Sequence, residues 1–277
     1  MPGLLLAYNR SGNLRSVSMS VRHWILFCAL GSCAAARGQY VLDDADPCRA
    51  DGIVRPYAPL READVMWARR VWRVIDTRDA RNTAIAAPQG LKQNCRNLMA
   101  VIRHGLKDEG GIIAYDPGPE GKDDAFRTRM SGAGLRSILS ALDTLGAEAI
   151  GRFMVKEDWL FDRRRGVMEA RIIGLAPMIE VRGEEDGELR GYRVLFWLYY
   201  PECRQLFSWW TAAMGRDGER LSYEALLDRR RFFGEITKVS NVSDRGITGT
   251  RTGVEALLES DAQRQRLLDM GFDLWHY

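Results

Sequence analysis

The middle of the chain carries a hydrophobic pattern typical of β-strands. Three stretches, 153–161, 167–181 and 192–200, are rich in β-branched and aromatic residues, and polar turns at 162–166 and 183–191 separate them. Consecutive strands joined by short turns pair antiparallel, so the pattern predicts a meander. Apolar side chains occupy both faces of the third stretch, which predicts a central strand that is covered on both sides.

Before the meander the hydrophobic period becomes helical. Trp67, Val71, Val74 and Ile75 recur at offsets of 0, 4, 7 and 8, which places them on one face of a helix. Arginines at 69, 70 and 73 would then face away from that stripe. The sequence therefore predicts an amphipathic helix over this segment.

Further helices flank the strands on both sides, and the order of helices, strands and helices indicates an α+β fold. We expect a central antiparallel β-meander packed with helices from the N-terminal and C-terminal parts. Thr252 and Glu255 have the spacing of a capping box. The remaining predicted elements are a helix from about Leu91 to the glycines at 110–111, a short strand at 112–115, a weaker helix at 135–145, and, after Pro201, a helical pattern through 222–231, a short stretch at 235–239 and a last helix from Thr252.

Residues 1–38 have the features of a secretory signal peptide. From Met19, the expected start, a short segment with Arg22 precedes 13 uncharged residues, and Ala34 and Ala36 offer a cleavage site. The apolar stretch is shorter than the roughly 18 residues that span a bilayer. Cys33 also fits a lipoprotein site, but the alanines that follow it favour ordinary cleavage.

The net charge of +3 depends on this leader. Residues 1–38 hold four arginines and no acid, so their removal leaves 36 basic and 37 acidic residues and a balance of −1. A chain with that balance has no electrostatic reason to bind nucleic acid or an anionic membrane. After the leader we expect an extended, proline-containing arm at 39–60 and one domain at 61–277.

Three cysteines, Cys48, Cys95 and Cys203, remain after the leader. Because three is an odd number, at most one disulfide forms within the chain and one thiol is left over. The pattern leaves open which two of them pair. The hydrophobic fraction of 46% is high enough for an apolar core, which must carry the fold.

The sequence lacks the short motifs of common active sites. No Gly-x-Ser-x-Gly, phosphate-binding Gly-Lys-Ser/Thr or His-Glu-x-x-His pattern occurs. Glu157, Asp158 and Asp162 could supply the paired carboxylates of a glycosidase. Arginines at 163–165 would instead keep them ionised, which favours a solvated charged turn. We predict no catalytic residue, no cofactor and no metal site.

Several blocks, in a fixed order over about 57–277, carry a family resemblance. They are Trp67–Asp76, Lys156–Asp162, Val167-Met168, Arg171–Pro177, Phe196–Glu202, Ser240–Val242, Asp244-Arg245, Gly253–Ser260 and Asp273–Tyr277. Together they resemble the gliding-motility protein N family (GldN, also called PorN). His276, Ser243 and Gly246 depart from the residues expected of that family.

The resemblance implies a non-enzymatic component of the type IX secretion system of Bacteroidota, which exports proteins across the outer membrane and supports gliding. It implies a periplasmic protein that is held at the outer membrane by its partner, a lipoprotein of the GldK/PorK type, with which it forms a ring. It also implies coupling to the motor proteins GldL/PorL and GldM/PorM. Neither nucleic acid nor a small-molecule substrate is expected as a partner.

Arginine and tryptophan are abundant, and only five of the 40 basic residues are lysine. Both residue types are typical of protein–protein contacts, although a GC-rich gene would favour arginine codons as well. Buried core positions are the commoner fate of tryptophan at helical spacing. The residues that we expect to serve as core or contact anchors are Trp67, Trp72, Trp159, Trp209 and Trp210.

An alternative from another class is a periplasmic hydrolase or solute-binding protein with a pocket on the central sheet. It predicts a monomer with a concave, ligand-sized pocket and convergent polar groups. A ring subunit instead predicts large contact surfaces with central aromatic and arginine anchors.

Overall fold

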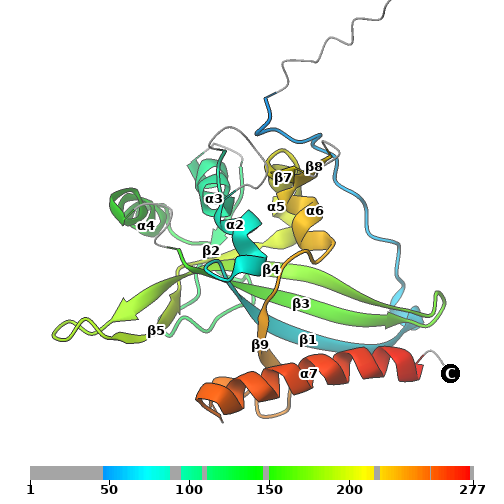
Figure 1. The fold of residues 1–277 in the computed structure, drawn as a ribbon. Coiled ribbons are helices and arrows are strands. Elements are labelled where there is room, and N and C mark those ends of the chain that lie inside the picture. The colour runs from blue at the N-terminus through cyan, green and yellow to red at the C-terminus, as the bar shows by residue number, and fades with distance from the viewer. Residues whose placement is uncertain are drawn as a thin grey trace, which may run out of the picture. The chain divides into compact units, whose positions relative to one another are not determined.

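A seven-stranded sheet organises the fold, and every strand pair in it is antiparallel (Figure 1). The computed structural model describes residues 46–87, 95–107, 111–145, 150–214, 219–249 and 251–274. The predicted signal peptide and the first residues of the predicted arm lie outside this part. Neighbouring strands follow the order β2-β6-β4-β3-β1-β9, and β5 pairs with β4 alone. The strands are β1 (Val65–Asp76), β2 (Ala114–Tyr115), β3 (Arg152–Asp162), β4 (Val167–Arg182), β5 (Leu189–Val194), β6 (Trp197–Tyr199) and β9 (Glu235–Val239).

The predicted α+β fold and its antiparallel meander are confirmed. β3, β4 and β5 follow one another along the chain and pair as neighbours, joined by the turns at 163–166 and 183–188. Five of the predicted elements outside the meander also occur. Helix α4 (Gly132–Leu145), helix α6 (Tyr223–Asp228) and helix α7 (Gly253–Asp273) lie where the pattern placed helices, and helix α3 (Leu98–Lys107) and strand β2 fall inside longer predicted ranges.

The helix predicted over Trp67–Ile75 is wrong, because this segment is the long strand β1. It pairs with β3 on one side and with β9 on the other. Val71, Trp72 and Ile75 are all buried, so both faces of the strand are covered and its apolar residues do not alternate with polar ones. Its valine, isoleucine and tryptophan content is that of a strand, and the helical offsets were coincidental.

The stretch at 192–200 is not one central strand. It divides into β5 and β6, and Tyr200 already begins helix α5 (Tyr200–Ser208). Opposite the break, Pro177 of β4 accepts a hydrogen bond from the Leu195 amide but has no N–H to return, so the ladder is interrupted there. The prediction that both faces are covered is correct for 194–198, although β3 and β4 occupy the centre of the sheet.

Three smaller differences concern the C-terminal half. The stretch at 235–239, read as part of a helical pattern, is strand β9 at the sheet edge. A separate hairpin, β7 (Thr211–Met214) and β8 (Arg220–Ser222), was not anticipated. Thr252 is the N-cap residue of α7 as predicted, but its side chain makes no capping hydrogen bond.

One face of the long strands carries two apolar clusters with a charged group between them. On β3, Phe153 and Val155 belong to a large cluster that contains residues of α3, α5 and α6. Further along the same face, Trp159 belongs to a smaller cluster with Leu267 of α7. Glu157 occupies the position between them, since side chains two residues apart in a strand share a face. α7 runs along β1 and β9 (Figure 1).

The opposite face of the sheet has its own apolar cluster. Trp72, Met178 and Trp197 pack there against Tyr115 and Phe126 from the segment that follows α3. Close packing at this face explains Gly174 of β4, because a Cβ atom there would lie 2.6 Å from Cζ of Phe126. No helix in the described residues is long and apolar enough to cross a membrane.

Candidate protein-interaction surfaces

The five tryptophans that the sequence singled out lie in three separate places. Trp67 and Trp159 share the cluster under α7, and Trp72 lies on the opposite face of the sheet. Trp209 and Trp210 lie at the end of α5, far from the other three in the sequence. Trp72, Trp159 and Trp210 are buried, Trp67 is half-buried, and Trp209 is 45% exposed. They therefore do not form one contact surface.

Trp159 takes part in a buried ion-pair network. Its indole N–H donates to Oε2 of Glu157 at 2.8 Å. The same carboxylate pairs with Arg73 of β1 at 3.1 Å and with Arg230, which precedes β9, at 2.9 Å. Burial lowers the pKa of Arg73, while the charge of Glu157 opposes that change. The network ties two strands and a loop together between the two apolar clusters.

Trp72 is held in a second polar group, on the other face of the sheet. Its indole N–H donates to Oδ2 of Asp124 at 2.6 Å, and Nζ of Lys156 lies 3.1 Å from Oδ1 of the same carboxylate. Nζ of Lys156 also lies 5.1 Å from the ring centroid of Phe126. Burial lowers the pKa of Lys156, and Asp124 works in the opposite direction. These contacts fix the segment around Asp124 on the sheet.

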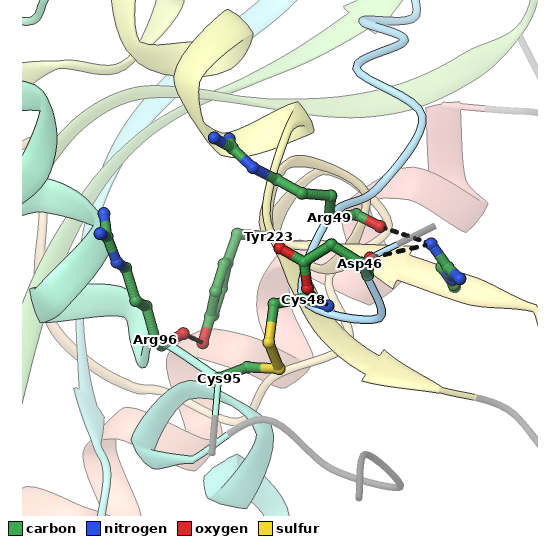
Figure 2. The surroundings of a disulfide bond; sticks show 7 residues. Asp46, Cys48, Arg49, Cys95, Arg96 and Tyr223 are labelled. Atoms are coloured by element: carbon green, nitrogen blue, oxygen red, sulfur yellow. Dashed lines mark hydrogen bonds between the residues drawn. A yellow bond between two sulfur atoms is a disulfide. The ribbon is translucent and has the colours of Figure 1, made fainter. Parts of the chain in front are cut away.

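Trp210 lies beside a disulfide that joins the arm to the segment before α3. Figure 2 shows the disulfide and the residues around it. Cys48 of the arm and Cys95 form a disulfide across a sequence separation of 47 residues. Each cysteine is followed by an arginine, and the guanidinium carbons of Arg49 and Arg96 lie 4.1 and 4.5 Å from the ring centroid of Trp210. The indole is thus contacted by two cations that the disulfide holds near each other. The disulfide resolves the pairing that the sequence left open, and Cys203 is the free, buried thiol.

Hydrogen bonds to backbone atoms hold the same region in place. Arg220 of β8 donates to the carbonyl groups of Asp46 and Arg49 at 3.2 and 2.9 Å, and the Tyr223 hydroxyl donates to the Arg96 carbonyl at 3.1 Å (Figure 2). The Thr211 amide donates to the Cys48 carbonyl at 3.0 Å. The start of the described arm is therefore fixed to the β7–β8 hairpin.

The rest of the described arm runs along α5. Arg204 pairs with Glu224 of α6 at 2.5 Å, donates to the Arg55 carbonyl at 2.5 Å, and lies over the ring of Tyr57 at 4.2 Å. Gly52, with a φ of +71°, leaves no room for a side chain beneath the ring of Trp209. Trp209 thus contacts the arm even though it is half-exposed. In the neighbouring ion pair, burial raises the pKa of Glu224, against the lowering effect of Arg204.

Helix α7 presents a second apolar stripe to solvent. Its inner face contacts the sheet through Leu267 and Ser260, whose hydroxyl accepts a hydrogen bond from the Ile236 amide at 2.8 Å. Apolar residues also recur at offsets of 0, 3, 4, 14 and 18 on a different face, and this outer stripe consists of Val254, Leu257, Leu258, Leu268 and Phe272. Val254 and Phe272 are 71 and 72% exposed. The stripe consists of an apolar patch at each end of the helix, with the exposed polar residues Asp261 and Gln265 between them on the same face. Exposed apolar patches of this kind mark protein–protein contact sites.

A groove of about 440 Å³ adjoins the C-terminal half of the outer stripe. Its lining residues are Trp159, Met168, Leu267, Leu268, Gly271 and Phe272, so the surface is almost entirely apolar. It lacks the convergent polar groups of a catalytic or solute-binding pocket. The groove is better suited to apolar side chains of a protein partner.

A second groove, at the N-terminal half of α7, is polar, but its groups bond to one another. The Asn241 amide donates to the carbonyls of Val239 and Arg245, at 2.8 and 2.7 Å, and its oxygen accepts from Ser243. Such an internally satisfied loop offers few free groups to a ligand. Among the described residues, no cluster of His, Cys, Asp and Glu is arranged to hold a metal ion.

The prediction of a solvated charged turn at Glu157, Asp158 and Asp162 is wrong for two of the three. The side chains of Glu157 and Asp162 are buried, and only Asp158 is partly exposed, where it pairs with Arg70 at 2.7 Å. Hydrogen bonding from Arg165 lowers the pKa of Asp162, in line with the expected effect of the neighbouring arginines. The partners of Glu157 come instead from elsewhere in the chain.

The sequence analysis did not predict the outer stripe of α7. When one helix carries apolar residues on two faces, its hydrophobic pattern no longer shows a single helical period. The capping signal locates the start of the helix, and the spacing of Val254, Leu257 and Leu258 places them on one apolar helix face. In the structure these three residues face solvent. Leu267 falls on a different helix face from these three residues, and this difference in phase is the signal that could have revealed a second contact surface.

Comparison with protein families gives one match. Residues 60–276 match the family model described as "Gliding motility associated protein GldN". The matched range contains the whole sheet, all of the described helices and every residue of α7's outer stripe. A search of curated proteins finds no match.

Proposed function

Because the chain belongs to the GldN family of gliding-motility associated proteins, we propose that it is a non-enzymatic structural subunit of the type IX secretion and gliding machinery. The observation that carries this role is the outer stripe of α7, an apolar surface next to an apolar groove. Structural subunits act through large contact surfaces, whereas enzymes need convergent polar groups.

The proposed location is the periplasm. The Cys48–Cys95 disulfide supports it, because structural disulfides persist in oxidising compartments such as the bacterial periplasm. The predicted signal peptide at 1–38 points the same way.

The proposed partners are a GldK/PorK-type outer-membrane lipoprotein, with which the protein would form a ring, and the motor proteins GldL/PorL and GldM/PorM. The outer stripe of α7 is the surface that we assign to the lipoprotein. A lipoprotein partner would hold this subunit at the membrane, which agrees with ordinary cleavage of the leader in place of acylation at Cys33.

The function is tested in a strain from which the gene is deleted. We expect the strain to retain type IX cargo inside the cell and to recover export when the full-length gene is returned. Normal export in the deletion strain would rule out the proposed function.

The surface is tested by complementing the same strain with Leu258→Ser/Phe272→Ser. This variant should fold normally, yet fail to co-purify with the outer-membrane lipoprotein and fail to restore export. Val242→Ser is the matched control, because Val242 is fully exposed and lies outside the stripe. Equal behaviour of the two variants would remove the stripe from the proposal.

A further inference from the structure

Two arginines that lie far apart in the sequence contact the ring of Trp210. The guanidinium carbon of Arg49 lies 4.1 Å from the ring centroid, and that of Arg96 lies 4.5 Å from it. Because both distances are measured to one point, the separation of the two guanidinium carbons cannot exceed their sum. Figure 2 shows both arginine side chains extending away from the disulfide. Arg49, Trp210 and Arg96 are named the arginine–tryptophan stack below.

Both arginines have a charge that is not neutralised within the described part of the chain. Arg49 and Arg96 are exposed, and neither forms an ion pair with another described residue. The nearby acidic residues of the arm, Asp46 and Asp51, accept hydrogen bonds from backbone amides of the arm instead. A guanidinium group that lies on an aromatic face keeps its N–H groups free to donate in its own plane. The stack therefore offers two positively charged donor groups to a ligand.

The burial of Trp210 supports a role for its ring. The side chain is only 6% exposed, yet its indole N–H has no hydrogen-bond partner among the described residues. A buried tryptophan usually pairs this group, and leaving it unpaired is unfavourable. The ring packs against His104 in a T-shaped geometry, with the two ring centroids 5.4 Å apart. The indole is thus positioned as a platform for the arginines even though its N–H is left unpaired.

The disulfide brings the two arginines to one ring. Each arginine directly follows one cysteine of this bond, and the cysteines are separated by 47 residues in the sequence. Hydrogen bonds then hold both backbones in place. Arg220 donates to the Arg49 carbonyl at 2.9 Å, and the Tyr223 hydroxyl donates to the Arg96 carbonyl at 3.1 Å. A site that is fixed before its ligand arrives loses less conformational entropy on binding.

The stack fits an extended segment with acidic side chains. Guanidinium groups bind carboxylates with two parallel hydrogen bonds. In an extended chain, side chains two residues apart share a face and lie roughly 7 Å apart, which is within the limit for the two guanidinium carbons. Alternate carboxylates can therefore reach one arginine each.

Apolar surface adjoins the stack. Trp209 is 45% exposed, and its ring lies over Gly52 of the arm. Ile53, the next residue of the arm, is 61% exposed. Arginine, aromatic and aliphatic side chains together are typical of protein contacts. This composition favours a protein segment as the ligand.

We propose that the arginine–tryptophan stack binds an extended acidic segment of another protein, with one carboxylate at Arg49 and the next alternate carboxylate at Arg96. The inference goes beyond the proposed function, because it names a second contact surface. Figure 1 shows the β7–β8 hairpin, which directly follows Trp210, well apart from α7. The test measures peptide binding and needs no export assay, so either proposal can fail without the other.

Binding is measured by fluorescence anisotropy with the purified full-length protein and a labelled synthetic peptide in which glutamate and valine alternate. We expect this peptide to bind, and its glutamine–valine counterpart to bind about tenfold or more weakly, since the charge-assisted hydrogen bonds are lost. Arg49→Gln/Arg96→Gln should weaken binding of the glutamate peptide by a similar factor. A wild-type protein that binds both peptides alike, or binds neither, would overturn the proposal.

Arg163→Gln/Arg164→Gln is the matched control. It also removes two exposed arginines that form no ion pair among the described residues, but these arginines do not lie over an aromatic ring in that part of the chain. This variant should bind the glutamate peptide as the wild type does. Equal losses in the two double variants would indicate a general attraction to basic surface and would rule out the proposed site.

Two further variants test the geometry of the stack. Arg49→Lys/Arg96→Lys keeps both charges but loses the planar guanidinium groups, so it should bind the glutamate peptide at least about fivefold more weakly. Cys48→Ser/Cys95→Ser, checked for folding by circular dichroism, should also bind more weakly, because the disulfide no longer holds the arginines at one ring. Wild-type affinity in either variant would contradict the proposal.

An anionic lipid surface is the competing ligand. Vesicles that contain phosphatidylglycerol should bind the protein no better than neutral vesicles do. If the anionic vesicles bind, the peptide does not, and Arg49→Gln/Arg96→Gln abolishes the vesicle binding, the stack contacts a membrane and the proposed peptide site is wrong.

Discussion

Arg73 and Glu157 form an ion pair across β1 and β3 in which the side chains are only 6 and 0% exposed. The pair lies between two apolar clusters on the same face of the sheet. Taking two charges out of water is costly, so the pair is stable only while its partners are all present. Arg230 and the indole of Trp159 also contact the carboxylate, and its hydrogen bonds all go to Oε2.

We expect Glu157→Gln to lower the free energy of unfolding by about 3–5 kcal/mol, because it leaves two arginines without their counter-charge in a buried site. Asp158→Asn, the adjacent residue on β3, breaks the exposed pair with Arg70 and should cost less than about 1 kcal/mol. Urea denaturation followed by circular dichroism measures both. Similar losses for the two variants would contradict the role of burial.

Removal of the disulfide should release the arm. We expect Cys48→Ser/Cys95→Ser to lower the free energy of unfolding by about 2–4 kcal/mol, since the cross-link closes a long loop in the unfolded chain. Limited proteolysis should then cut within 46–60. A reductant should destabilise the wild type and leave the double variant unchanged. If it destabilises both, the loss of stability in the wild type does not come from reduction of this disulfide.

Gly174 is predicted to tolerate no side chain. In Gly174→Ala the new methyl group would meet the ring of Phe126, and overpacking of this kind costs about 1–3 kcal/mol. Gly249→Ala, which adds a methyl group where no atom lies within 4 Å, should change stability by less than about 0.5 kcal/mol. Thermal unfolding compares the two. Phe126→Leu should recover part of the loss in Gly174→Ala, and no recovery would place the strain elsewhere.

Stability should fall in acid through Asp162. Hydrogen bonding from Arg165 and from the amides at 164 and 165 lowers its pKa in the folded protein. A carboxyl whose folded pKa lies below its unfolded value, about 4, stabilises the fold above that value and loses this effect as the pH falls through the folded pKa. Asp162→Asn should therefore reduce stability at pH 7 and flatten the decline between about pH 5 and pH 2. Chemical denaturation at several pH values measures the free energy of unfolding. If its dependence on pH is the same in Asp162→Asn and the wild type, this carboxyl is not a source of the acid-induced loss of stability.

The meander was predictable because its strands are long, β-branched and separated by polar turns, so local pattern and tertiary pairing agree. β1 was not, because a strand buried on both faces has no alternation and its tryptophans happened to fall at helical offsets. The partners of Glu157 were also hidden. Arg73 and Arg230 lie 84 and 73 residues from it, so only the folded sheet brings the three together.

The candidate interaction surfaces were likewise predictable only in part. The aromatic anchors were identifiable by residue type, but type alone does not decide burial, and Trp209 and Trp210 differ although they are adjacent. The disulfide needed geometry, because three cysteines allow three pairings. The charges at 163–165 and 183–188 were visible as turns, whereas their placement at the two ends of one strand required the structure.

The length of β4 also has a mechanical consequence. A pulling force applied between its two turns runs along the strand, while the hydrogen bonds that join it to β3 lie across the strand. Such a load shears the whole ladder at once, so the bonds resist together and do not break one after another as they would when a strand edge is peeled. The sheet should therefore resist extension strongly when it is pulled along β4.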